Sequence, residues 1–249
     1  MISSVDCLVV LGHSIESVTN NGVTVCDDHR QWAPTRLIQE RNEKGYRTGI
    51  RNWKLRPDDE SAYIGGGNLV TLAATQFIET REFPKLLVFA AGRPFYLKEA
   101  NTPPLLNEGV FMKTSLIRKL SSKSQLHAMT VLSDNKNTKD DIEKPLSLAF
   151  ERGWQSVEYL MLGMRIPRAE AFLLETLKSR PALQEMTTSF LPAEDLVRER
   201  YVKSPVVLAM FEALLKRIEG SRAFQKTMQD EQGGIAALQK EEYKGTGNY

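Results

Sequence analysis

The feature that most constrains the fold is an order of strand, polar loop and helix that occurs twice between residues 129 and 174. An apolar run at 129–132 precedes a polar turn at 135–138 and a helical pattern, and a second apolar run at 157–162 precedes another helix. Alternation of buried strands with amphipathic helices is typical of a parallel sheet covered by helices. We therefore predict an α/β, Rossmann-like fold with a mostly parallel sheet flanked by helices.

Two earlier apolar runs fit the same sheet. The first run covers residues 7–11 and is followed by Gly12. The second covers residues 85–91 and is followed by Gly92. Continuous apolar runs are expected of strands that are buried on both faces. The spacing of apolar residues predicts helices at 69–78, 108–120, 142–152 and 168–177, and a last strand at 186–190. Because proline has no amide hydrogen, Pro145 predicts that the helix around it begins late or bends.

The remaining segments predict an insertion and an appendage. Residues 13–64 are polar and irregular, and we expect them to form an insertion over the carboxyl edge of the sheet. Residues 181–249 read mainly as helices, and the last helical stripe is broken at Gly233 and Gly234. The chain should therefore consist of a Rossmann-like domain at 1–180 and a helical C-terminal appendage at 181–249.

Charge and composition exclude several classes of partner. The 33 basic and 31 acidic residues give a net charge of +2, which creates no broad field for nucleic acid or an anionic bilayer. No apolar run is long enough to cross a membrane, and the first residues lack a signal-peptide pattern. We expect a cytoplasmic protein without a membrane span, in which any anion is bound locally.

Metal chemistry is not expected. The two cysteines, Cys7 and Cys26, are too few for a disulfide framework and lack zinc-finger spacing. No set of histidine, cysteine and acidic residues has the spacing of metal ligands. Three glycines at 65–67 precede a predicted helix, where amides can cradle phosphate, but they lack the nucleotide-loop spacing and are better read as flexible turn glycines.

Candidate binding residues follow the predicted strands, because ligands of α/β sheets bind beyond the carboxyl ends of the strands. The residues in these positions are Gly12, His13, Gly92, Arg93, Glu108, Asn137, Thr138 and Arg168. Arginines suit anions, and His13 or Glu108 can transfer a proton. His13 and Glu108 are therefore the candidate catalytic residues, and all eight are candidate ligand-binding residues.

Several of these residues also have a structural interpretation. Thr138 with Asp141 fits a variant of the capping box, and Asn137 can hydrogen-bond its own turn. Arg168 can pair with an acid of its own helix, and Glu108 suits the first turn of a helix through the macrodipole alone. Both interpretations stay open for each residue at this point.

The order of these pieces resembles the YdcF-like and SanA-like family. The resemblance covers residues 5–12 and 65–177 and rests on Gly12, Gly92, Glu108, Asn137 with Thr138, and Pro167 with Arg168. It implies a Rossmann-like sheet with a nucleotide-sized site and, through the YdcF branch, S-adenosylmethionine as a ligand. The chain has Arg165 where the family usually has a histidine and Asn135 where it usually has a serine.

The sequence therefore predicts a protein that binds a nucleotide-like or other anionic small molecule at the carboxyl edge of a parallel sheet. The alternative is a transferase or hydrolase acting on a phosphorylated or nucleotide-type substrate, with Arg93 and Arg168 holding the anion. A third and weaker interpretation makes the insertion and the helical tail a partner-binding surface. Neither the reaction nor the oligomeric state follows from the sequence.

Overall fold

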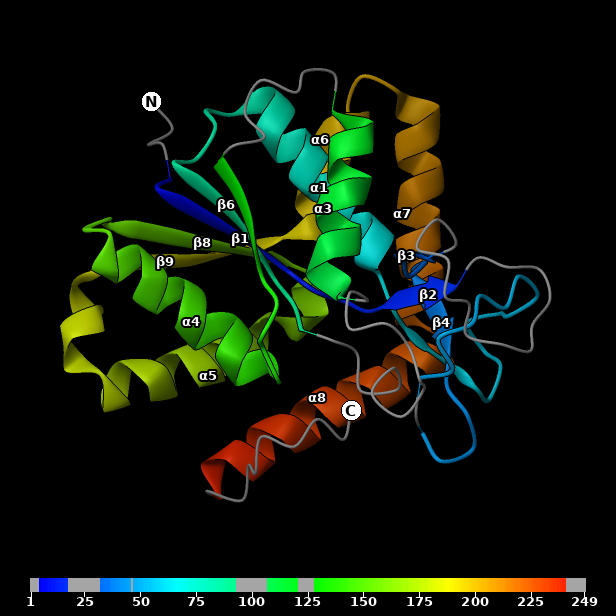
Figure 1. Cartoon of the computed structure of the whole chain (residues 1–249). Helices are drawn as coiled ribbons and strands as arrows, with labels where there is room; N and C mark the ends of the chain where they lie inside the picture. Colours follow the sequence, from blue (N-terminus) through cyan, green and yellow to red (C-terminus); the bar gives the residue numbers. More distant parts are fainter. Residues whose placement is uncertain (1–4, 18–31, 46, 93–106, 121–127, 241–249) are drawn as a thin grey trace.

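A five-stranded sheet forms the centre of the computed structural model, which describes residues 5–17, 32–45, 47–92, 107–120 and 128–240 (Figure 1). Its strands are β1 (Cys7–Leu11), β6 (Leu86–Ala90), β7 (Met129–Leu132), β8 (Ser156–Met161) and β9 (Thr187–Pro192). The order is β7-β6-β1-β8-β9, and every neighbouring pair is parallel. The predicted Rossmann-like α/β fold is confirmed.

Helices cover both faces of this sheet (Figure 1). One face carries α1 (Gly67–Thr80), α3 (Glu108–Lys119) and α6 (Ala193–Tyr201), with α7 (Pro205–Glu219) packed against α6, and the other carries α4 (Thr138–Glu151) and α5 (Ile166–Ser179). Strand β1 shows why the apolar run is continuous. Leu8 and Val10 belong to the core under α1, whereas Cys7, Val9 and Leu11 belong to the core under α4 and α5.

The order of strands contains a switch point. From β1 the chain moves outward to β6 and β7, and it then returns to the other side of β1 to form β8 and β9. The helices that follow these two strands, α1 after β1 and α5 after β8, therefore cover opposite faces of the sheet. A reversal of this kind marks the switch point beyond the carboxyl ends of the two strands. This is the position at which ligands of open α/β sheets bind.

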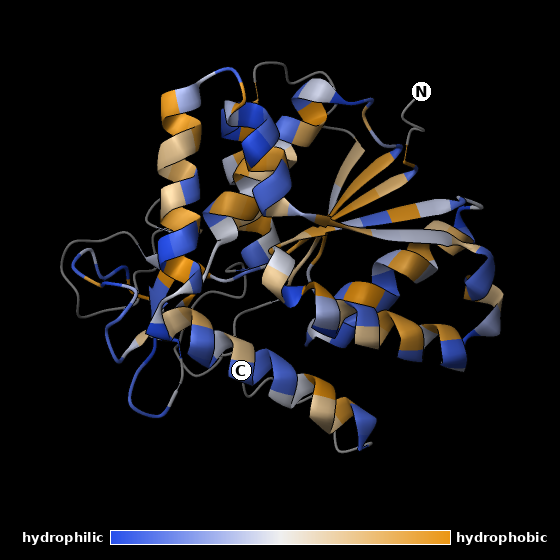
Figure 2. Ribbon diagram, turned by 180° about the vertical axis from the view of Figure 1, so that it is seen from behind, coloured by the Kyte–Doolittle hydropathy of each residue, from blue (hydrophilic) through white to orange (hydrophobic). Residues whose placement is uncertain are grey.

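The segment between β1 and α1 forms two small antiparallel sheets. Strand β2 (Ile15–Ser17) pairs with β3 (Trp32–Pro34), and β4 (Ile38–Glu40) pairs with β5 (Ala62–Ile64). In Figure 2 much of this region is hydrophilic, whereas β1 and β6 at the centre of the large sheet are hydrophobic along their length. Helix α8 (Arg222–Gln239) contacts β5 of this segment and also α5 of the main domain.

Helix α4 begins earlier than the sequence predicted. It starts at Thr138 rather than at residue 142, because the side chain of Asn137 caps it by accepting a hydrogen bond from the amide of Asp140 at 3.0 Å. Pro145 lies inside the helix, where its ring is buried. The cap and the burial of this ring outweigh the hydrogen bond that proline cannot make.

The helical appendage also differs from its prediction. Helix α6 was not predicted, since its polar sequence contains only a short apolar pattern around Leu196 and Val197. Helix α8 continues through Gly233 and Gly234 without the expected break. Within the described ranges, no helix has the length and apolar character needed to cross a bilayer.

Candidate functional site

Two glycines bring the ends of β1, β6 and β7 into contact. A Cβ atom on Gly12 would lie 2.7 Å from Oε2 of Glu108, and a Cβ atom on Gly92 would overlap the carbonyl oxygen of Asn135. The carbonyl of Gly92 accepts a hydrogen bond from the amide of Glu108 at 3.2 Å. Both glycines therefore hold positions where only hydrogen fits, and they let the polar side chains that follow the strands approach one another.

Three of the other predicted binding residues lie at the same edge of the sheet, two after β7 and one after β8. Asn137 and Thr138 begin α4 after β7, and Arg168 is buried in the first turn of α5 after β8. Since Asn137 is the cap, the interpretation of Thr138 with Asp141 as a capping box is wrong. Arg93 lies outside the described residues.

His13 is buried directly after Gly12 and is held in its neutral form. The amide of Leu162 donates to Nε2 of His13 at 3.4 Å, which leaves the hydrogen on Nδ1. Burial lowers the pKa of His13 well below its usual value of 6.5, and the charges of Arg165 and Arg47 lower it further. Among the described residues Nδ1 has no partner, so His13 offers one free N–H donor.

Glu108 begins α3 and reaches back to the end of β1. Its Oε2 accepts a hydrogen bond from the amide of Ser14 at 2.9 Å, and its Oε1 lies 3.7 Å from Nη1 of Arg47. Burial raises the pKa of Glu108, although Arg47, the Ser14 amide and Arg165 all act to lower it. The carboxyl group thus has tertiary contacts that the macrodipole of α3 alone would not explain.

Four arginines gather beside these residues, and we call them the arginine cluster: Arg41, Arg47, Arg165 and Arg168. Two come from the segment before α1 and two from the start of α5, and their side chains are between 6% and 16% exposed. Burial lowers the pKa of Arg165 to about 10, and the positive charges of the other three members contribute to this change. The charges of Arg41, Arg47 and Arg168 thus all act on Arg165, and Arg165 and Arg168 share the same acid, Glu231.

Helix α8 supplies the acids that balance part of this charge. Nη1 of Arg165 and Nη1 of Arg168 each lie 3.6 Å from Glu231, and Nη1 of Arg41 lies 2.6 Å from Oδ2 of Asp230. Gly234 completes the contact, because a Cβ atom there would lie 2.7 Å from Nε of Arg168. The site is therefore built jointly by the sheet, the segment before α1 and the C-terminal helix.

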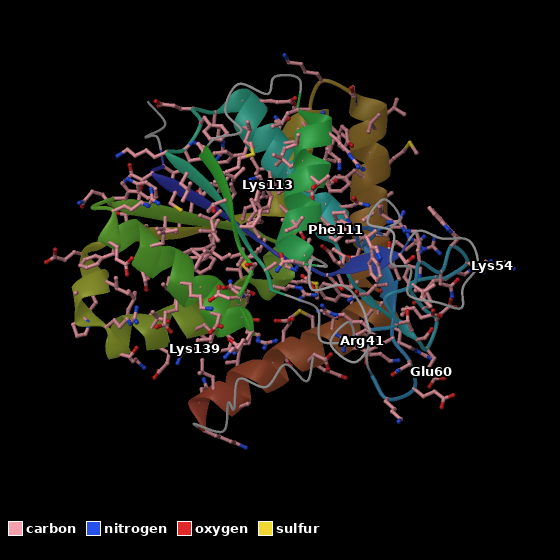
Figure 3. The ribbon with its side chains drawn as sticks, in the orientation of Figure 1. Arg41, Lys54, Glu60, Phe111, Lys113 and Lys139 are labelled. Atoms are coloured by element: carbon pink, nitrogen blue, oxygen red, sulfur yellow. The ribbon has the colours of Figure 1, made fainter. Side chains whose placement is uncertain are left out.

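An open cavity of about 520 Å³ lies next to the cluster. Arg41 and Tyr63 line it together with Glu60 and Lys226, and Figure 3 labels Arg41 and Glu60 in this part of the molecule. The guanidinium group of Arg41 stacks on the ring of Tyr63 at 3.8 Å from the ring centre. Arg41 thus connects the buried cluster with an open hollow of the surface.

Asn135 and Asp141 place hydrogen-bond acceptors on the β7 side of the site. Nδ2 of Asn135 donates to Oδ1 of Asp141 at 2.7 Å, whereas Oδ1 of Asn135 is buried and has no partner among the described residues. Burial raises the pKa of Asp141 well above its usual value, and the charges of Glu108 and Asp140 raise it further. Glu108 therefore lies between an arginine-rich side and an acceptor-rich side.

The glycine-rich start of α1 is not an open phosphate cradle. The amides of Gly65, Gly66 and Gly67 already donate to Leu37, Arg36 and Thr35, at 2.8, 2.7 and 3.1 Å. Gly66 has a φ of 95°, which favours glycine. These glycines form a fixed turn rather than the flexible one expected from the sequence.

Sequence reasoning missed most of the cluster and its acids. Arg47 lies in a stretch of the sequence that is rich in basic residues, 47–56, and Arg165 follows a predicted strand, so each gave a weak signal. Asp230 and Glu231 gave none, because nothing in a helical stripe indicates which buried cation an acid on that helix will meet.

The comparisons do not add a function to this geometry. No group of three or more histidine, cysteine or acidic side chains in the described part of the chain could hold a metal ion. The chain matches no family model, no curated protein and no solved structure.

Proposed function

We propose that this protein binds a nucleotide-like or other anionic small molecule at the carboxyl edge of its parallel sheet, where the arginine cluster holds the negative charge. The observation that carries this proposal is a set of buried N–H donors without partners among the described residues. They are Nδ1 of His13 and the Nε groups of Arg41, Arg47 and Arg165. A buried donor left unpaired costs about 1–3 kcal/mol, so an anion that accepts these hydrogen bonds would be bound favourably.

The charge of the site supports the same proposal. Four guanidinium groups face three carboxyl groups, those of Asp230, Glu231 and Glu108, so the cations of the site outnumber the acids that they contact. Guanidinium groups form paired hydrogen bonds to phosphate and carboxylate, and they remain charged when buried. The excess positive charge lies at the switch point of the sheet, where ligands of this fold class are expected.

S-adenosylmethionine, which the resemblance to the YdcF branch suggests, remains a prediction. This ligand carries a sulfonium and an ammonium group against one carboxylate, so its net charge is positive. An excess of arginine favours a phosphate-bearing ligand over it. S-adenosylmethionine and phosphate-bearing ligands should therefore be tested in the same binding experiment.

Catalysis is the second candidate function, and the burial of both His13 and Glu108 at this edge of the sheet is the observation that favours it. Both are buried near the end of β1, and the pKa of Glu108 is raised toward the range in which a carboxyl group can donate a proton. We propose a transferase or hydrolase acting on a phosphorylated substrate as this alternative. Turnover of a panel of phosphorylated metabolites would separate it from binding alone.

A thermal-shift experiment tests the binding proposal. The probes are adenosine 5′-monophosphate, inorganic phosphate, S-adenosylmethionine and uncharged adenosine, each with wild-type protein, Arg165→Gln and Arg180→Gln. Arg180 ends α5 at the opposite edge of the sheet and is about half exposed, so it serves as the matched control. The two phosphates should raise the Tm of the wild type and of the control, because a ligand that binds only the folded state stabilises it.

The Arg165→Gln variant should lose most of this shift. If that variant does not fold, Arg47→Gln provides the same test from the other side of the site. The proposal would be wrong if phosphates leave the wild-type Tm unchanged, or if Arg165→Gln and Arg47→Gln respond as the wild type does.

A further inference from the structure

We infer that the anion is a phosphate ester that also carries hydroxyl groups, as phosphorylated sugars and nucleotides do, and that Asn135, Asp141 and Glu108 accept hydrogen bonds from those hydroxyls. This inference rests on the proposed function, because it assumes that the arginine cluster binds the phosphate. It adds the chemical class of the rest of the ligand.

The first observation is the unpaired oxygen of Asn135. This residue is 5% exposed, and its Oδ1 has no hydrogen-bond partner among the described residues. Because Nδ2 donates to Asp141, the planar amide turns Oδ1 away from that carboxyl group. If Asn135 served only to fix the loop after β7, this buried acceptor would be left unsatisfied at a cost of about 1–3 kcal/mol.

The second observation is the chemistry around this oxygen. Asp141 and Glu108 are carboxyl groups whose pKa values are both raised by burial, and the charge of Glu108 acts on Asp141. This side of the site offers amide and carboxyl oxygens, which accept hydrogen bonds from hydroxyl groups but give a phosphate no cationic partner. The acceptors therefore select a different part of the ligand from the part that the arginines select.

The third observation is that Glu108 joins the two sides. Its Oε1 lies 3.7 Å from Arg47, and the close approach at Gly92 holds the backbone of Asn135 against the end of β6. The hydrogen-bond donors follow β1 and β8, and the acceptors follow β6 and β7. All four strands are neighbours, so both kinds of group lie along one edge of the sheet. A ligand with a phosphate at one end and hydroxyls beside it has the matching order of groups.

Two probes that differ only in hydroxyl groups test this inference. Ribose 5-phosphate and tetrahydrofurfuryl phosphate share a five-membered ring and a phosphate ester, but only the first has hydroxyls on the ring. Dissociation constants for both are measured by calorimetry with wild-type protein, Asn135→Leu, Asp141→Asn and Gln184→Leu. Gln184 is exposed and precedes β9 at the amino edge of the sheet, so it is the control.

Ribose 5-phosphate should bind the wild type and the control about tenfold more tightly than the deoxygenated probe, as two added hydrogen bonds would give. This ratio should fall toward one in Asn135→Leu and in Asp141→Asn, and circular dichroism checks that each variant is folded. Equal affinity of both probes for the wild type would overturn the inference and leave the anion-binding proposal standing. A ratio unchanged in both variants would also overturn it, and failure of both phosphates to bind would overturn the two proposals together.

Discussion

Burial favours the uncharged form of both polar residues nearest the end of β1, although one is a base and the other an acid. The pKa of His13 is lowered and that of Glu108 is raised, in each case with desolvation as the largest cause. Arg165 remains charged, because its pKa of about 10 still lies well above neutral pH. The positive charge of the site therefore comes from guanidinium groups, and His13 contributes a neutral donor.

His13 should make the stability of the protein fall in mild acid. The unfolded chain binds a proton at this residue near pH 6.5, whereas the folded chain keeps it neutral. As the pH falls below that value the unfolded state binds more protons, so the free energy of unfolding decreases by up to about 1.4 kcal/mol for each pH unit. The His13→Gln variant should lack this part of the slope.

Urea unfolding of both proteins between about pH 7.5 and pH 5.5 measures the effect. Glu108 and Asp141 have raised pKa values and contribute in the opposite direction, since stability from a raised acid is lost as the pH increases. They are present in both proteins, so the difference between the two slopes isolates His13. Identical slopes would show that His13 takes up its proton in the folded state as easily as in the unfolded state.

At the scale of helices and strands, the predictions were best where one physical cause determined the pattern. Strand β1 was recognisable because both of its faces are buried, which makes every position apolar. Helix α4 was misplaced because its start depends on the Asn137 cap rather than on apolar spacing. Helix α6 escaped detection because three buried residues in a polar stretch do not make a clear stripe.

The two adjacent glycines of α8, Gly233 and Gly234, allow the same substitution to be compared at an open and at a crowded position of one helix. A Cβ atom on Gly233 would meet nothing within 4 Å, so Gly233→Ala should raise stability by about 0.5–1 kcal/mol through helix propensity. A Cβ atom on Gly234 would press on the guanidinium group of Arg168. Gly234→Ala should therefore gain less stability and also weaken the phosphate-induced thermal shift. Equal gains and equal shifts in the two variants would rule out this role for Gly234.

At the scale of the whole molecule, α8 packs across the edge of the sheet and brings its acids to the arginine cluster. The sequence did not predict this packing. Strand ends gave the positions of His13, Glu108 and Arg168 because parallel strands point their carboxyl ends to one edge. The approach of Asp230 and Glu231 depends instead on how the last helix packs across that edge. Residue patterns report burial, but they do not report which distant surfaces meet.

Removing the acid at Glu231 should expose this dependence. The Glu231→Gln variant leaves Arg165 and Arg168 without that counter-charge, which should lower the free energy of unfolding by about 3 kcal/mol. Phosphate should restore more stability to this variant than to the wild type at the same ionic strength. Glu212→Gln, which breaks an ion pair with the half-exposed Arg198, should change little in either condition. If the Glu231→Gln variant is as stable as the wild type, then Glu231 does not hold Arg165 and Arg168 in place.

The position of these acids in the chain has a consequence for biosynthesis. All four arginines leave the ribosome before Asp230 and Glu231 do, so the sheet domain can collapse while its strongest cations still lack their acidic neighbours. Nascent chains stalled before α8 should therefore depend on dissolved anions for compactness more strongly than the released protein does.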